Sequence, residues 1–127
     1  MSISSTVYSR LSHASITGTV PASRIFPTDP ERGTDWPFLV YTIKDASPVT
    51  TMSGTAGLSN YTVQVDVWAK SLSSADTIAN AIAARLHCYR GSGVQGSFLV
   101  EQSNEQLADE TEGDIYHTVQ SYSVWAA

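Results

Sequence analysis

Residues 61–69 read Tyr-Thr-Val-Gln-Val-Asp-Val-Trp-Ala, and this stretch decides the fold because its residue types alternate with a period of two. Every second residue from Tyr61 to Ala69 is apolar, and the residues between them are polar apart from Trp68. Successive side chains of a β-strand point to opposite faces of a sheet. The stretch therefore predicts a half-buried strand. An aromatic residue on its polar side suggests that Trp68 belongs to a contact surface.

The hydrophobic period changes to about three and a half immediately after Lys70. Ser73 can cap the first free amides of a helix, and Asp76 three residues later favours the positive end of the helix dipole. Apolar residues then recur on one helical stripe, namely Ala75, Ile78, Ala79, Ile82, Leu86 and Tyr89. We expect a helix about 25 Å long that packs its apolar side on a sheet.

The rest of the chain predicts further strands around this unit. The expected elements are a short helix over 2–12, a central strand over 36–43, a hairpin arm over 46–58 with its turn at 53–57, and strands over 97–106 and 115–125. The predicted fold class is α+β: a mainly antiparallel β-sheet with a hairpin arm, one long α-helix packed on a sheet face and a short N-terminal helix. A chain of 127 residues fits a single domain, 1–127.

Charge is distributed unevenly along the chain. The net charge of the chain is -5. The segment from Gly91 to the end contains six acidic residues and no lysine or arginine. An acidic surface repels phosphate backbones, so we expect no specific binding of nucleic acid. The first twenty residues contain no long apolar run and no charged leader, which argues against a secretory signal or a membrane span. The lone Cys88 suggests a reducing compartment.

Residues that could carry chemistry do not form a recognisable pattern. The three histidines, His13, His87 and His117, have no carboxylate or cysteine at ligand spacing, and no serine lies in a nucleophile elbow. The acidic run near residue 110 lacks the ligand order of a calcium loop. We therefore predict no catalytic residues, no metal, no cofactor and no enzymatic activity.

Two segments indicate self-association. A long arm that the core of the monomer does not require is either disordered or held by another chain. In the last strand, polar residues interrupt the apolar pattern, as expected if one face is covered only on assembly; they are Thr118, Gln120, Ser121 and Ser123.

The order of these segments resembles that of the tail completion proteins of long-tailed bacteriophages, also called tail terminators or tail-to-head joining proteins. The resemblance rests on residues 24–27, 36–41, 61–69, the Ala-rich helix 75–86, 94–98 and 116–125. It implies a virion protein of the tail or neck, assembled in the cytoplasm of the bacterial host. Such a protein closes into a ring, typically a hexamer, between the tail tube protein and the head-tail connector or stopper protein, and double-stranded DNA passes through its lumen.

The arm and the strands supply the residues expected at the subunit interface: Val49, Thr51, Met52, Leu58, Trp68 and Tyr122. The acidic block supplies those expected in the lumen: Asp109, Glu110, Glu112 and Asp114. Repeated negative charge there would let DNA slide without binding. The alternative is that these acids lie on the outer rim and only aid solubility. An alternative function is a dimeric α+β module that binds a small ligand between subunits, with Tyr61 and Trp68 lining the pocket.

Overall fold

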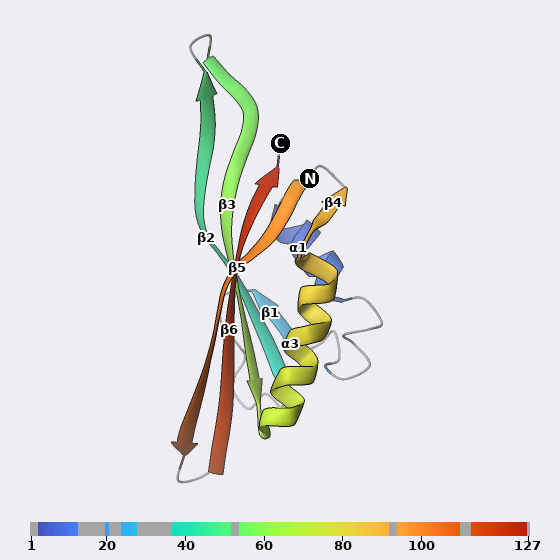
Figure 1. Cartoon of the computed structure of the whole chain (residues 1–127), viewed down its shortest axis with the longest axis vertical. Coiled ribbons are helices and arrows are strands. Elements are labelled where there is room, and N and C mark those ends of the chain that lie inside the picture. The colour runs from blue at the N-terminus through green and yellow to red at the C-terminus, as the bar shows by residue number, and fades with distance from the viewer. Residues whose placement is uncertain are drawn as a thin grey trace.

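A computed structural model shows six strands and two helices in the part of the chain that it describes (Figure 1). The structure describes residues 3–12, 20, 24–27, 37–51, 54–91, 94–109 and 113–126. In chain order the elements are α1 (Ile3–Leu11), β1 (Ile25–Pro27), β2 (Phe38–Thr51), β3 (Gly54–Ala69), α3 (Leu72–Leu86), β4 (Tyr89–Gly91), β5 (Val94–Asp109) and β6 (Gly113–Ala126).

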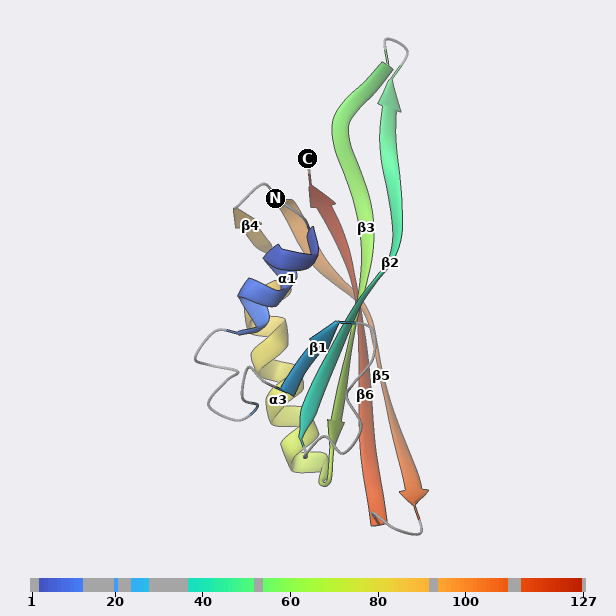
Figure 2. The same ribbon diagram turned by 180° about the vertical axis from the view of Figure 1, so that it is seen from behind.

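The six strands form one mixed sheet in the order β1-β2-β3-β6-β5-β4. Only β1 runs parallel to its neighbour, and the other four pairings are antiparallel. The β2–β3 hairpin extends from one end of the molecule and the β5–β6 hairpin from the other (Figure 1). Both helices lie on the same side of the twisted sheet, as the view from behind also shows (Figure 2).

The predicted fold class is wrong. Most of the described residues lie in strands, and the sheet is mixed and curls into a half-barrel. The helices are both short, with 9 residues in α1 and 15 in α3, so no single long helix defines the fold. The sequence suggested too little strand because strands of 14 and 16 residues continue through segments rich in serine, threonine and glycine, whose pairing comes from the neighbouring strand.

Helix α3 begins where the hydrophobic period changes, but its cap differs from the predicted one. Ser71, and not Ser73, is the N-cap, and its hydroxyl accepts a hydrogen bond from the amide of Ser74 at 3.1 Å. The buried residues of the helix are Ala75, Ile78, Ala79, Ile82 and Leu86. They pack against the inner face of the sheet, which we define as the face carrying Val63, Val65 and Val67.

The hairpin formed by β2 and β3 is tighter than predicted. Thr51 pairs with Gly54 and Thr50 with Thr55, so residues 54–57 belong to β3 and not to the turn predicted at 53–57. Strand β2 also continues from Phe38 to the turn without a loop, since Ala46, Ser47 and Pro48 keep their partners on β3. The predicted central strand over 36–43 is therefore only the first half of a much longer strand, second in the sheet order.

Strand β6 differs from the expectation that its polar residues mark an uncovered face. Thr118 and Gln120 point to the inner face and are 1% and 0% exposed. The Gln120 amide donates to the Ala79 carbonyl at 3.0 Å and accepts a hydrogen bond from the Tyr122 hydroxyl at 2.7 Å. Buried polar groups persist where such partners are available. Ser121 and Ser123, which alternate with them, lie on the outer face and are half-buried.

Candidate assembly surfaces

The outer edge of β5 has no neighbour along most of its length. Strand β4 pairs with β5 only near its start, through Tyr89–Ser97 and Gly91–Val94. The next edge amide, that of Leu99, donates to Nδ1 of His87 at 3.0 Å. From Val100 to Asp109, no strand in the described part of the chain lies alongside β5 on that side. Unpaired backbone groups of this kind are a template for another strand.

The outer edge of β2 is free at the opposite end of the molecule. Strand β1 pairs only with Leu39, Val40 and Tyr41. Beyond Tyr41, within the described ranges, no strand lies on that side of β2 as far as Thr51. The upper half of β2 is accordingly open in the view from behind (Figure 2). The sheet thus has two long free edges, one at each end.

Side chains near the free part of β5 are unusually exposed for a strand. All residues from Glu101 to Gln106 are exposed, and none of them is apolar. Phe98 and Val100 are 46% and 68% exposed. The ring of Phe98 lies over the backbone of Gly96, where an added Cβ would come within 3.0 Å of the ring. A strand with neither face covered is typical of a surface that gains a partner on assembly.

A row of rings crosses the outer face of the sheet, which is the face opposite the helices. Phe26 meets Phe38 edge-on at 6.5 Å between centroids, and Phe38 stacks on Trp68 at 6.1 Å. Trp68 in turn stacks on His117, with ring centroids 3.8 Å apart and planes 7° apart. These residues sit on four neighbouring strands, β1, β2, β3 and β6, so the row fastens the strands to one another.

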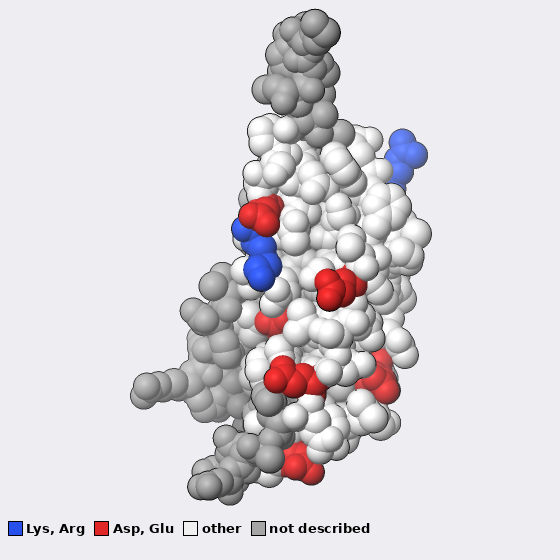
Figure 3. Space-filling view, turned by 60° about the vertical axis from the view of Figure 1, so that its left-hand side comes forward, with Lys and Arg blue, Asp and Glu red and all other residues white. Residues whose placement is uncertain are grey.

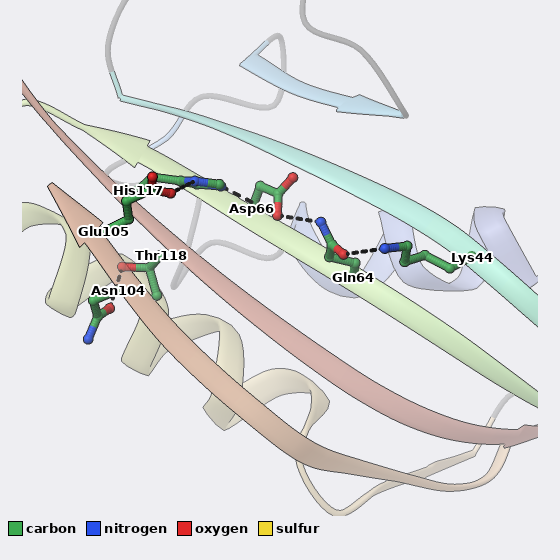
Figure 4. A network of polar contacts seen from close by, with 7 residues as sticks. All are labelled: Lys44, Gln64, Asp66, Asn104, Glu105, His117 and Thr118. Atoms are coloured by element: carbon green, nitrogen blue, oxygen red, sulfur yellow. Dashed lines mark hydrogen bonds and ion pairs between the residues drawn. The ribbon is translucent and has the colours of Figure 1, made fainter. Parts of the chain in front are cut away.

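A line of polar contacts continues from His117 in both directions (Figure 4). Its Nε2 lies 3.6 Å from the Asp66 carboxylate and its Nδ1 lies 3.6 Å from the Glu105 carboxylate. The Gln64 amide donates to Asp66 at 2.9 Å, and Lys44 donates to Gln64 at 3.0 Å. The contacts join β2, β3, β6 and β5.

Acidic side chains outnumber basic ones on this part of the surface (Figure 3). Glu101, Glu105 and Asp114 are exposed. Lys44 is held by the Gln64 amide. Such a surface offers few positive charges that could bind a phosphate backbone.

The comparison with family models decides the identity. Residues 5–127 match the model of the family described as tail completion protein gp17. The chain belongs to this family. It is therefore a structural protein of the phage tail and a component of the virion, as the resemblance in its sequence implied. No curated protein matches the chain.

A solved structure supports the fold of this family member. A chain in the structure titled "Virion of native gene transfer agent (GTA) particle" aligns with a TM-score of 0.74 at 12% sequence identity. The alignment covers 94% of this chain and 90% of that one. At this identity the likeness concerns the fold alone.

The interface residues predicted from the sequence are found in different environments. Val49, Thr51 and Leu58 lie in the paired strands of the hairpin, where the structure describes their backbone only, and Met52 lies outside the described residues. Trp68 is half-buried in the aromatic row. Tyr122 is 1% exposed on the inner face, so we remove it from the interface.

Of the residues predicted to line the lumen, only Asp114 has a described side chain. It is exposed at the start of β6. Asp109 ends β5, and Glu110 and Glu112 lie outside the described residues. The arrangement around His117 was missed, because its carboxylate partners Asp66 and Glu105 are far away in sequence. The uniformly polar run over 101–106 was the signal that could have identified β5 as a free edge.

Other kinds of site receive little support. Among the described residues, no group of three or more histidines, cysteines or acids could hold a metal ion. A hollow of about 200 Å³ beside Leu72, Tyr116 and His117 is smaller than the pockets that usually hold small ligands, which begin at about 300 Å³. None of the described helices is long and apolar enough to cross a membrane.

Proposed function

We propose that copies of this tail completion protein close into a ring, typically of six, at the head-proximal end of the tail. There the ring stops growth of the tube protein and presents a surface to the head connector. DNA passes through its lumen. Membership of the tail completion family supports a role at the tail. The observation that carries the ring is the pair of free strand edges at opposite ends of one sheet.

Two different edges on one subunit favour a head-to-tail association. A contact between unlike surfaces leaves a free copy of each surface on the growing assembly, so it continues until the rotation closes a ring. Covering both edges also pairs backbone groups that a monomer must leave to water. A dimer with a ligand pocket would use one self-complementary surface instead, and nothing in the sheet favours it.

The outer face supports passage of DNA without binding. Beside the row of rings, it carries polar and acidic side chains, including Gln64, Asp66, Glu105 and Ser121. Turned toward a channel in every copy, it would present repeated negative charge and few cations, so each phosphate would meet repulsion instead of a partner. We keep Asp109, Glu110, Glu112 and Asp114 as proposed lumen residues, because in the sequence they lie at the end of β5, near the start of β6 or between the two, and both strands carry this face.

Electron microscopy of particles made without this protein tests the role. Full heads separate from tails of irregular length support both termination and joining. Tails of normal length left unjoined would restrict the role to joining. Virions of normal appearance in its absence would refute the proposal.

Charge reversal tests the lumen. Glu110, Glu112 and Asp114 are replaced together by lysine, and DNA ejection from assembled particles is scored. We expect ejection to slow or stall because phosphates would now bind. As a matched control, Ser73, Asp76 and Asn80, all exposed on α3, are replaced by lysine and should leave ejection unchanged. Normal ejection from the first variant in intact virions contradicts a lumen position for these acids.

A further inference from the structure

We propose that the free edge of β5 in one copy pairs antiparallel with the free edge of β2 in the next copy, so that the sheets of neighbouring subunits join. This inference rests on the proposed ring and identifies its subunit junction. The two runs are Val100–Asp109 on β5 and Thr42–Thr51 on β2. Their lengths match, so neither leaves a long stretch of backbone unpaired.

Strand direction agrees with this pairing. Within one subunit β2, β3, β6 and β5 alternate in direction, so β2 and β5 run opposite ways. Subunits of a ring share one orientation relative to its axis. The β5 strand of one copy therefore meets the β2 strand of the next copy antiparallel, and the alternation continues across the junction. Antiparallel strands can pair directly without any crossover connection.

The short strands β1 and β4 set the offset between the two copies. Both runs can be referred to positions on β3. Glu105 pairs with His117, which pairs with Trp68 on β3. Ser47 pairs with Asn60, eight residues away from Trp68 on the same strand. Bringing Glu105 opposite Ser47 of the next copy therefore displaces that copy by about eight residues, or roughly 27 Å, along the strands. With this offset β4 lies beyond the end of the partner's β2, and β1 lies beyond the end of the partner's β5, so neither obstructs the junction.

The alternative of β5 pairing with β5 of another copy is unfavourable. A two-fold pairing centred near Ser103 would bring Glu101 opposite Glu105 twice, and like charges directly opposite each other destabilise a sheet. It would also stop at a dimer, because both partners would use the same edge. Pairing β5 with β2 instead brings Glu105 opposite the uncharged Ser47.

Pro48 on β2 restricts the pairing and does not prevent it. Proline lacks the amide donor, and it occurs on edge strands where that position faces outward. Lys44 lies at an irregularity between Ile43 and Asp45 in the register of β2 with β3. Both features make the β2 edge a poor template for indiscriminate pairing in a monomer. A partner must therefore fit one register.

The offset has a geometric consequence for the ring. Between one junction and the next the joined sheet contains β2, β3, β6 and β5 of each copy. At about 4.8 Å apart these strands span roughly 19 Å, compared with the offset of roughly 27 Å along the strands. A ring without any rise from one copy to the next then requires strands tilted by roughly 55° from the ring axis, somewhat more than the tilt of about 35–45° typical of barrels.

Disulfide trapping tests the junction. The variant carries Glu105→Cys and Ser47→Cys in a Cys88→Asn background, and is added to purified tails assembled without this protein. Paired residues on neighbouring strands have Cα atoms about 4.5–5.5 Å apart, within the range that a disulfide spans. We expect oxidation to give linked species up to the size of the ring. Each single-cysteine variant should stay monomeric on a denaturing gel.

Two matched controls distinguish the proposed register from general proximity. Ala46→Cys with Glu105→Cys should not link, because Ala46 and Ser47 point to opposite faces of the sheet. Asn80→Cys on α3 with Glu105→Cys should not link either. Dimers formed by a Ser103→Cys variant alone, in the same Cys88→Asn background, would overturn the proposal in favour of β5 pairing with β5, because Ser103 faces itself in that pairing.

Hydrogen exchange needs no substitution and provides a second readout. On joining the tail, amides over 101–109 of β5 should exchange at least tenfold more slowly, while those of α3 stay unchanged. Rings visible by electron microscopy without such protection and without cross-links overturn this junction but leave the proposed function intact. If the wild-type protein forms no ring on tails at all, both proposals fail.

Discussion

The imidazole of His117 lies flat against the indole of Trp68, with ring centroids 3.8 Å apart and planes 7° apart. The two residues are direct partners across β3 and β6, the central pair of the sheet. The same imidazole is flanked by carboxylates on β3 and β5. One side chain therefore connects the middle of the sheet to the strand whose edge is proposed to bind the next subunit.

Replacing Trp68 by leucine should lower the free energy of unfolding. Aromatic pairs contribute about 0.5–1.5 kcal/mol beyond the area that they bury. A double-mutant cycle with His117→Gln, followed by chemical denaturation, should give a coupling energy of about 1 kcal/mol. Trp125→Leu, at a position 36% exposed, is the control and should cost less. A coupling energy near zero would mean that the stacked rings do not stabilise the fold.

Gln120 should be sensitive to a change that preserves its size. Gln120→Met leaves the Tyr122 hydroxyl without its acceptor and removes the hydrogen bond to the Ala79 carbonyl. Leaving a buried polar group unpaired costs about 1–3 kcal/mol, which urea denaturation would measure. Gln95→Met, at an exposed position, should change stability by less than about 0.5 kcal/mol. Equal losses for both variants would contradict this.

Stability should fall in alkaline solution because of Tyr122. Burial raises the pKa of its phenol above the ordinary value of about 10. The folded state therefore keeps the proton at pH values where the unfolded chain has lost it, and the free energy of unfolding declines as the pH rises above about 10. Tyr122→Phe should show a shallower decline between about pH 10 and 11.5, with a loss of about 1 kcal/mol at neutral pH. An unchanged slope would rule out Tyr122 as the source.

Arg10 should hold α1 against the end of α3. Its Nε and Nη2 donate to the Arg85 carbonyl at 3.1 and 2.8 Å, and its guanidinium lies 3.7 Å from the centroid of the Tyr89 ring. Arg10→Met keeps the aliphatic stem but loses these contacts, at a cost of about 1–3 kcal/mol. Hydrogen exchange should speed up in α1 first. Arg90→Met, on the exposed side of β4, is the control.

Cys88 should tolerate glycine better than alanine. Its φ of 60° is the left-handed conformation that side chains disfavour. Cys88→Gly should therefore leave stability unchanged or raise it by up to about 1 kcal/mol, whereas Cys88→Ala should not. Thermal unfolding of both variants measures the difference. A Cys88→Ala variant more stable than Cys88→Gly would contradict backbone strain at this position.

The sequence by itself determined the local structure of the strand-helix unit and the family. The alternation over 61–69 and the stripe from Ala75 to Leu86 each record which side of one element is buried, and that information is local. It also determined that the last third of the chain is acidic. The family resemblance depended on the order of such segments and needed no contact between them.

Only the tertiary structure decided the rest. A polar residue of β6 can face the core only where neighbouring groups form hydrogen bonds with it. Gln120 is buried because folding brings the Ala79 carbonyl and the Tyr122 hydroxyl within hydrogen-bond distance of its amide. The free edges of β2 and β5 likewise result from where β1 and β4 end. Pairing between strands is set by partners distant in the chain, so no local period in the sequence reports which edges stay open.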